Sequence, residues 1–206
     1  MRREMAPTSI DVGVRDRLTA RFGSAGASRL SWSSVEPSTP VTSSLPLFLL
    51  DVDGVLNPYA APACPPGYTE HELFPGEEPV RICAAHGHWL GELATRFQLV
   101  WATAWGAEAN RLLAPLLQLP GLPVIGFPPP PFHPGDKLRF VIDYAGNRPL
   151  TWVDDQLLPH AYAWAASRRA PTLLIGIDPA EGLTRPVIDQ SLRWAHNQPI
   201  GGDALR

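Results

Sequence analysis

The sequence is short of cysteine, of lysine and of long apolar runs, and each shortage excludes a class of protein. Its two cysteines, Cys64 and Cys83, are too few for a disulfide framework and lack the spacing of a zinc site. No apolar run approaches the roughly 20 residues that a membrane-spanning helix needs, and the first residues lack the apolar core of a secretion signal. We therefore expect a cytoplasmic protein without a membrane partner.

Charge is also scarce, because charged residues make up 18% of the chain and the formal net charge is -3. A balance this close to neutral gives no reason to expect broad binding to nucleic acids or membrane surfaces. No segment points to a protein partner. Binding of an anionic ligand must therefore depend on local charges at a defined site.

The composition divides the chain into two parts. Hydrophobic residues make up 45% of the 206 positions, enough for one domain with a sizeable core. Ser, Thr, Pro and Gly dominate from Gly23 to Ser44, a composition typical of flexible segments. We predict a flexible N-terminal tail at residues 1–44 and a folded domain at residues 45–206.

Short apolar runs alternate with helix-like segments through the predicted domain. The expected strands are Leu47–Asp51, Leu99–Thr103, Pro123–Phe127, Thr151–Asp154 and Thr172–Ile177. The expected helices lie near His88–Phe97, Ala107–Leu117, Lys137–Tyr144, His160–Arg169 and Pro186–His196. Strands that are apolar throughout and separated by helices indicate an α/β fold, with a mostly parallel five-stranded sheet covered on both faces. Ligands of such sheets bind at the carboxyl ends of the strands.

Residues 57–81 interrupt this alternation. Strand-like segments at Tyr68–Phe74 and Val80–Ile82 flank the turn-forming segment Pro75–Pro79. This pattern predicts a β-hairpin. Because the interruption follows directly on the end of the first strand, we expect it to form a small flap over any site at that end.

The first expected strand delivers two carboxylates, Asp51 and Asp53, in the sequence Asp-Val-Asp-Gly. Alternate residues of an extended chain lie on one side, so both carboxylates are expected at one site. Two carboxylates this close repel each other unless a cation or a shared proton intervenes. An acidic turn is the simpler alternative, since Asp-Gly is a common turn dipeptide.

Further reactive groups follow at the ends of later elements. Thr103 closes the second strand and Lys137 opens a helix, while Asp154 and Asp155 close the fourth strand. Carboxylates that converge with a hydroxyl and an ammonium suit Mg²⁺ and a phosphoryl group, because Mg²⁺ prefers oxygen ligands and is often shared with substrate phosphate. Lys137 is also the only lysine among 17 basic residues, which favours a position that requires a compact ammonium.

These motifs, in this order, resemble the haloacid dehalogenase-like (HAD) superfamily of phosphohydrolases. The resemblance covers roughly residues 46–196, and its motif set is specific. The contexts Trp-Ala-Thr-Ala-Trp and Trp-Val-Asp-Asp are closest to small, nearly capless bacterial members, some of them related to RNA-repair phosphatase domains. The resemblance implies a three-layer Rossmann-like catalytic domain and a Mg²⁺-dependent phosphatase. Its expected substrate is a phosphorylated small molecule or nucleic-acid end.

The resemblance also implies a role for each residue. Asp51 is the expected nucleophile, which forms an aspartyl-phosphate, and Asp53 is the expected general acid and base. Thr103, Ala104 and Lys137 are expected to bind the phosphoryl group. The expected metal ligands are Asp51, Asp53 through its backbone carbonyl, Asp154 and Asp155, where either of the last two can bind directly or through water.

Two other classes of protein share part of this pattern. A receiver-type signalling domain also gathers acids, a threonine and a lysine at strand ends, but its lysine comes last, whereas Lys137 precedes Asp154 and Asp155. A HAD-fold binding or regulatory protein without turnover is the second alternative, although no motif residue is missing here. The phosphatase interpretation therefore accounts for more of the sequence.

Histidine and tryptophan near the strand ends have structural explanations. His86 and His88 do not indicate a metal site, since residues i and i+2 diverge on a helix, and we expect solvated or capping side chains. Trp105 and Trp152 flank the expected site and could stack on a ring, but tryptophans at strand ends are more often part of the core.

Overall fold

The computed structural model describes residues 45–128 and 132–198. The predicted tail at residues 1–44 lies outside these described residues. Within them, no helix combines the length and the apolar character needed to cross a membrane.

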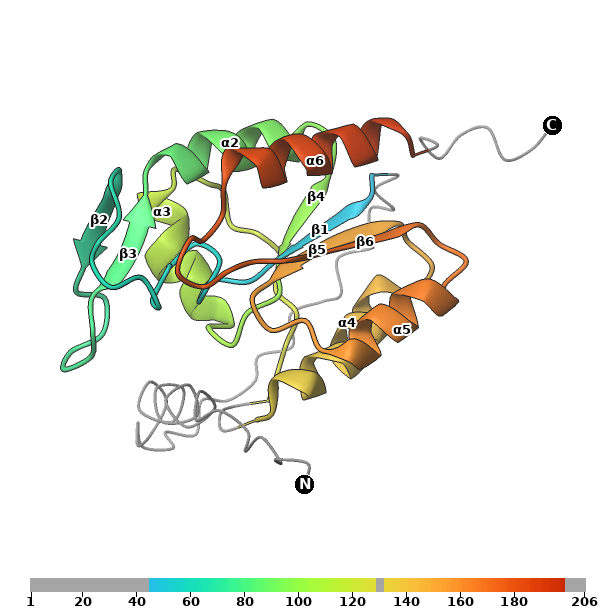
Figure 1. The fold of residues 1–206 in the computed structure, drawn as a ribbon, viewed down its shortest axis with the longest axis horizontal. Coiled ribbons are helices and arrows are strands. Elements are labelled where there is room, and N and C mark those ends of the chain that lie inside the picture. Colours follow the sequence, from blue (N-terminus) through green and yellow to red (C-terminus); the bar gives the residue numbers. More distant parts are fainter. Residues whose placement is uncertain (1–44, 129–131, 199–206) are drawn as a thin grey trace, which may run out of the picture.

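A four-stranded parallel sheet forms the centre of the molecule, in the order β4-β1-β5-β6 (Figure 1). The strands are β1 (Leu47–Leu50), β4 (Gln98–Trp101), β5 (Leu150–Asp154) and β6 (Thr172–Gly176). Strand β1 pairs with β4 on one side and β5 on the other, which leaves none of its residues exposed. This burial explains why the strand is apolar at every position rather than at alternate ones. The predicted α/β class is confirmed.

The predicted fifth strand, Pro123–Phe127, is wrong as a strand. Only Val124 of this segment forms a bridge, a single parallel one to Trp101 at the edge of the sheet. Pro123 has no N–H to donate to a ladder, and Pro128 follows the segment, so regular pairing does not extend. The sheet therefore has four strands and one bridging residue among the described part of the chain.

Helices cover both faces of the sheet, as predicted. Helices α2 (Ala85–Ala94) and α6 (Arg185–His196) lie on one face, and α4 (Lys137–Ala145) and α5 (Pro159–Ser167) lie on the other (Figure 1). Alternate residues of β1 serve the two layers: Phe48 and Leu50 join the core under α2 and α6, and Leu47 and Leu49 join the core under α4 and α5. Each such fully buried side chain contributes about 1.5–3 kcal/mol.

The segment predicted as a helix at Ala107–Leu117 is less regular than expected. It contains a π-helical turn, η1 (Ala109–Leu113), and one short α-helical turn, α3 (Ala114–Leu116). A further 3₁₀ turn, η2 (Pro134–Asp136), leads into α4. Asn110 fastens η1 to the domain, because its side-chain oxygen accepts hydrogen bonds from the Trp101 indole (2.9 Å) and the Leu122 backbone (2.8 Å).

The interruption after β1 forms the predicted antiparallel hairpin, with strands β2 (Tyr68–His71) and β3 (Val80–Cys83). Phe74, in the segment between these strands, packs edge-on against Trp105 with ring centroids 4.9 Å apart. The hairpin, called the flap below, is therefore attached to the domain through its apolar residues.

His86 contradicts the prediction of a solvated or capping side chain, whereas His88 is exposed as expected. His86 is 1% exposed, and its Nε2 donates to the Leu183 carbonyl at 3.1 Å. Its Nδ1 is buried and makes no hydrogen bond among the described residues. Burial lowers the pKa of His86 to about 4, although the Leu183 carbonyl opposes the change. Its neutral ring therefore joins α2 to the loop before α6.

This depressed pKa makes stability depend on pH. The unfolded chain takes up a proton near pH 6.5 and the native state only near pH 4, so the stabilising contribution is complete above the unfolded value and declines as the pH falls between them. The wild-type protein should lose about 3 kcal/mol of its free energy of unfolding across this range. We expect His86→Gln to abolish this loss, because it removes the titrating ring. Urea unfolding at pH 7.5, 6, 5 and 4 measures it.

The matched control for this experiment is His88→Gln, which replaces the exposed histidine of the same helix. It should leave the pH dependence of the wild type in place. An equal pH dependence in the wild type and in His86→Gln would show that the buried ring does not control acid stability.

Candidate active site

The predicted site residues meet at one edge of the sheet because their strands are neighbours and run parallel. Asp51 follows the last residue of β1, and Asp154 is the last residue of β5, which pairs with β1 directly. Thr103 lies just beyond β4, on the other side of β1. Lys137 is the first residue of α4. The carboxyl ends of three adjacent strands thus supply carboxylates and a hydroxyl, and the start of α4 supplies an ammonium.

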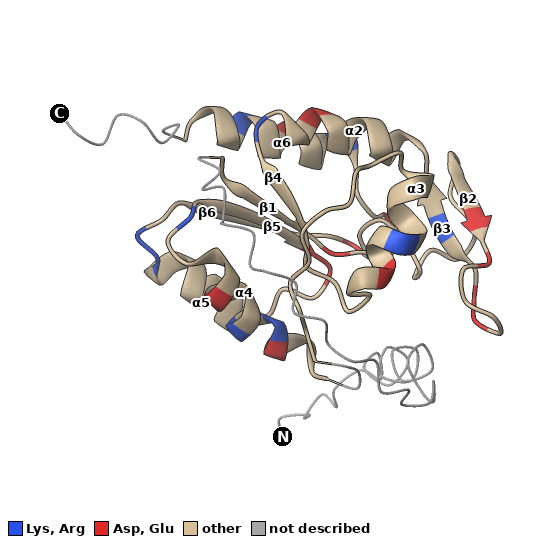
Figure 2. Ribbon diagram, turned by 180° about the vertical axis from the view of Figure 1, so that it is seen from behind, with Lys and Arg blue, Asp and Glu red and all other residues tan. Residues whose placement is uncertain are grey.

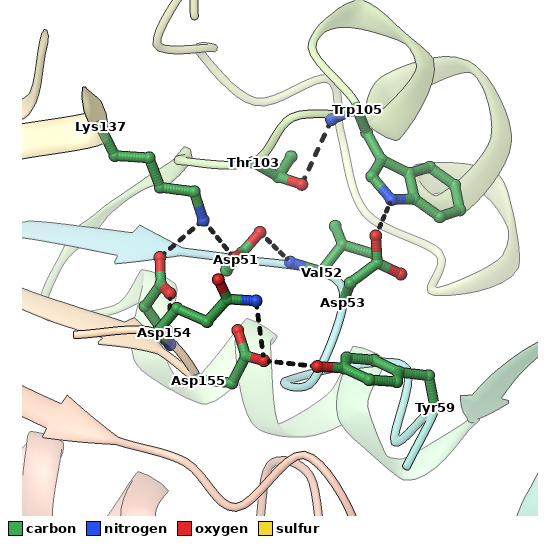
Figure 3. A network of polar contacts seen from close by, with 10 residues as sticks. Asp51, Val52, Asp53, Tyr59, Thr103, Trp105, Lys137, Asp154 and Asp155 are labelled. Carbon is green, nitrogen blue, oxygen red and sulfur yellow. Dashed lines mark hydrogen bonds and ion pairs between the residues drawn. The ribbon is translucent and has the colours of Figure 1, made fainter. Parts of the chain in front are cut away.

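Lys137 joins two of the carboxylates (Figure 3). Its Nζ donates to Asp51 Oδ2 and, at 2.8 Å, to Asp154 Oδ2. The side chain is buried, and Lys137 as a whole is only 7% exposed. Burial alone lowers the pKa of Lys137, but the negative charges of Asp154 and Asp51 outweigh it and hold the pKa above its ordinary value. The ammonium therefore stays charged inside the site.

Asp51 carries one fixed donor in addition to the lysine. The Val52 backbone N–H donates to Asp51 Oδ1 at 2.7 Å, which orients the carboxylate. Burial raises the pKa of Asp51 well above its ordinary value; Lys137 opposes this rise, and Asp154 and Asp155 add to it. The ionised form of Asp51 thus needs more positive charge than one ammonium provides.

Three carboxylates could hold a metal ion. Asp51, Asp154 and Asp155 each offer an oxygen atom, and these atoms lie within 4.8 Å of one another. Oxygen donors at such spacing suit a small hard cation. Because these three carboxylates lie beside a single ammonium, the cluster has an excess of negative charge that a divalent cation would balance. The donor set therefore fits the metal that the sequence motifs imply.

The last two acids are held by different partners. Asp154 Oδ1 accepts from the Gln156 backbone N–H at 2.9 Å, and the Tyr59 hydroxyl donates to Asp155 Oδ2 at 3.1 Å. Burial raises the pKa of Asp155 to about 6, and the charge of Asp154 adds to this rise. Asp155 also borders the cavity described below, whereas Asp154 is completely buried behind Lys137.

Asp53 lies apart from this cluster, and its side chain has different contacts. The Trp105 indole N–H donates to Asp53 Oδ2 at 2.9 Å, and the Asn57 amide donates to Asp53 Oδ1 at 3.0 Å. The sequence did not identify either donor. Trp105 is buried, as expected of a core tryptophan, but it also presents its one polar atom to the site. Figure 3 shows Asp53 beyond Asp51, on the side facing Trp105.

Thr103 and Ala104 line the same cavity as Asp155. The Thr103 Oγ1 accepts from the Trp105 backbone N–H at 3.3 Å. Because a hydroxyl that accepts at its oxygen still has a proton to donate, Thr103 can present that proton to an anionic group in the cavity. Its placement is compatible with the expected contact to a phosphoryl oxygen.

A cavity of about 440 Å³ opens above the strand ends. Its floor is made by Asp51, Asp53 and Asp155 together with Thr103 and Lys137. Its outer wall is made by the segment after Asp53, the flap, the segment before α4 and the residue after Asp155. The outer residues are Asn57, Tyr59, Ala61, Glu70, Gly76, Glu77, Glu78, Pro79, Arg81, Phe132, Pro134 and Gln156. Acidic segments lie both at the strand ends and on the flap (Figure 2). The flap thus borders the site, with Arg81 as its one basic residue in the cavity wall.

A comparison with protein families now identifies the domain. The model of the HAD domain in Swiss Army Knife RNA repair proteins matches residues 47–188. The chain belongs to this HAD family. A search of curated proteins found no match. The matched range begins at the first residue of β1 and ends inside α6, so it contains every residue of the site.

Position 54 of this HAD domain requires glycine for two reasons. Gly54 has a φ of +75°, where other residues are strained. A Cβ on Gly54 would lie only 2.4 Å from Cγ of Asp155. The turn after Asp53 is therefore packed directly against one of the candidate metal ligands, which the Asp-Gly motif alone does not reveal.

We expect Gly54→Ala to destabilise the domain by at least about 2 kcal/mol, because it combines left-handed strain with a clash. Urea unfolding measures the effect. The matched control is Gly91→Ala in α2, where an added Cβ meets nothing within 4 Å. Since alanine favours a helix over glycine, this control should gain about 0.5–1 kcal/mol. Equal effects of the two substitutions would contradict the packing of Gly54 against Asp155.

Proposed function

We propose that this HAD-family hydrolase is a Mg²⁺-dependent phosphomonoesterase that acts through an aspartyl-phosphate on Asp51. The observation that supports the proposal most directly is the Lys137 ammonium between Asp51 and Asp154, beside a third acid. A purely structural ion pair has no need of the extra carboxylate. A nucleophilic carboxylate that must meet an anionic phosphoryl group does need positive charge on both sides.

The carboxylates of Asp51, Asp154 and Asp155 would hold the Mg²⁺, together with the backbone carbonyl of Asp53 that the family resemblance adds. Bound Mg²⁺ would polarise the phosphoryl oxygens and offset their charge. Lys137 would contribute the second positive charge, and the Thr103 hydroxyl would donate a hydrogen bond to a phosphoryl oxygen.

In the first step, a carboxylate oxygen of Asp51 attacks phosphorus. The bond from phosphorus to the leaving oxygen breaks, and that oxygen takes both the bonding electrons and a proton from the Asp53 carboxyl group. The products are an aspartyl-phosphate on Asp51, a free alcohol and the Asp53 carboxylate. A positioned acid of this kind accelerates the step by about 10²–10⁴.

In the second step, the Asp53 carboxylate removes a proton from water as the water oxygen attacks phosphorus. The bond between phosphorus and Asp51 breaks, and its electrons restore the Asp51 carboxylate. Inorganic phosphate leaves, and Asp53 is protonated again. The cycle therefore returns both acids to their starting states without any oxidant or reductant.

The proposed substrate is a phosphomonoester small enough, at its phosphate end, to enter a cavity of about 440 Å³. A nucleic-acid end is the second candidate, because the matching family model describes RNA repair proteins. A panel of nucleotides, small phosphate esters and end-phosphorylated RNA and DNA distinguishes the two. A HAD-fold binding protein without turnover would hydrolyse none of them.

We also propose that residues 45–206 form the catalytic unit, with residues 57–81 as the insert that carries the flap and residues 1–44 as a tail outside catalysis. The position of the flap residues in the cavity wall supports this division. Removal of residues 1–40 should then leave phosphatase activity intact.

We expect the purified protein to hydrolyse p-nitrophenyl phosphate only with Mg²⁺, and Asp51→Asn to reduce kcat/KM by at least about 10³, because the amide cannot attack phosphorus. Steady-state assays with Mg²⁺, and after EDTA treatment, measure both effects. Asp143→Asn is the matched control, since Asp143 lies exposed on α4, away from the cavity. Activity that survives both EDTA and Asp51→Asn would contradict the proposal.

A further inference from the structure

Asn57 connects the flap to the candidate general acid. Its side-chain oxygen accepts a hydrogen bond from the backbone N–H of Arg81, a residue of flap strand β3, at 3.0 Å. Its amide nitrogen donates to Asp53 Oδ1 at 3.0 Å. Asn57 is only 2% exposed, so water does not replace either contact easily.

The two neighbours of Asn57 require opposite hydrogen-bonding groups. A backbone N–H can only donate, so the atom facing Arg81 must be an acceptor. The Asp53 carboxyl group must keep its proton for the leaving oxygen, and it has only acceptor sites once that proton is gone, so the atom facing Asp53 must be a donor. An asparagine side chain offers one of each at this reach. Aspartate would place a second carboxylate against Asp53, and leucine or alanine would remove both of these hydrogen bonds.

Asn57 is also fixed by its own backbone. Its carbonyl oxygen accepts from the Gly54 N–H at 2.9 Å, and its N–H donates to the Val52 carbonyl at 2.9 Å. The turn that begins at Asp53 therefore folds back so that residue 57 reaches residue 53. Both ends of the amide are thus held in place, one by this turn and one by the flap.

We propose that Asn57 is a positioning residue that uses the flap backbone as an anchor to aim the Asp53 carboxyl group at the leaving oxygen. This inference rests on the proposed function. Without the anchor, Asp53 loses the hydrogen bond that fixes its Oδ1, while the contact of its Oδ2 to Trp105 remains, so its carboxyl group is aligned less closely. Proton transfer to the leaving oxygen then becomes slower, because it requires close alignment of donor and acceptor.

The test compares a good and a poor leaving group of similar shape, p-nitrophenyl phosphate and phenyl phosphate. The value of kcat/KM reports only the first chemical step, so slow hydrolysis of the phosphoenzyme does not obscure the comparison. Asn57→Ala should lower kcat/KM for phenyl phosphate by about 10- to 100-fold, part of the full value of a general acid, and lower it for p-nitrophenyl phosphate by at most about threefold. Asn57→Leu, which fills the space better, is the second variant in case alanine prevents folding.

Asn110→Ala is the matched control. Asn110 also bridges two segments through both ends of its amide, accepting from Trp101 and Leu122 and donating to the Leu122 carbonyl, but it does not line the cavity. A loss through general destabilisation should affect both substrates equally. Leaving-group dependence here means the loss of kcat/KM for phenyl phosphate relative to the loss for p-nitrophenyl phosphate. Asp53→Asn should show the largest leaving-group dependence, because it removes the titratable group itself.

The flap anchor is tested at Arg81. Arg81→Pro removes the N–H that Asn57 accepts from, and Arg81→Ala keeps this N–H while removing the same side-chain contacts. Only the proline variant should reproduce the leaving-group dependence of Asn57→Ala. When Arg81→Pro is combined with Asn57→Ala, the difference between the two substrates should not increase further. The Arg81 N–H that proline removes has already lost its acceptor in the Asn57→Ala protein.

The outcomes separate this inference from the proposed function. If neither substrate is hydrolysed, or if Asp51→Asn keeps full activity, the proposed function fails. If Asp53→Asn discriminates between the substrates but both Asn57 variants reduce them equally, the phosphatase mechanism stands and Asn57 has no positioning role.

Discussion

A buried ammonium shared between two carboxylates is the interaction on which the rest of the site depends. Lys137 contacts Asp51 and Asp154 where almost no water reaches them. Removing such ions from water costs several kcal/mol each, and only close pairing offsets the cost. The arrangement needs neighbouring parallel strands that end at the same level, and a helix that begins beside them. The sheet order, with β1 between β4 and β5, supplies this geometry.

The site divides into two halves with different supports. The inner half, built on strand ends, holds the carboxylate cluster and Lys137. The outer half is built on turns and the flap, and it holds Asp53 between Trp105 and Asn57. Rigid strands suit the proposed nucleophile and metal ion, whose positions must hardly vary. A turn anchored to the flap suits the proposed general acid, whose carboxyl group must be aligned with the leaving oxygen.

The sequence predicted the parts of the structure that depend on local pattern. A continuous apolar run followed by Asp51 and Asp53 identified β1 and the strand end that carries the site. The apolar character of the segment around Val124 predicted a fifth strand. The segment does not form one, because its prolines have no N–H to donate to the hydrogen bonds of a sheet. The burial of His86 and the contacts of Asn57 to Arg81 depend on residues distant in sequence, which no local spacing encodes. The motifs thus predicted which side chains lie together at the sheet edge, but not the contacts that support them.

The most direct test of the account is intact-protein mass spectrometry after rapid acid quench of a reaction with p-nitrophenyl phosphate. Asp53→Asn should accumulate a phosphoryl adduct on Asp51, because the activated leaving group departs without a proton whereas the water that must follow has no base. The Asp51→Asn protein should carry no adduct. An adduct on Asp51→Asn, or none on Asp53→Asn while it still releases p-nitrophenol, would contradict the assignment of Asp51 as the nucleophile.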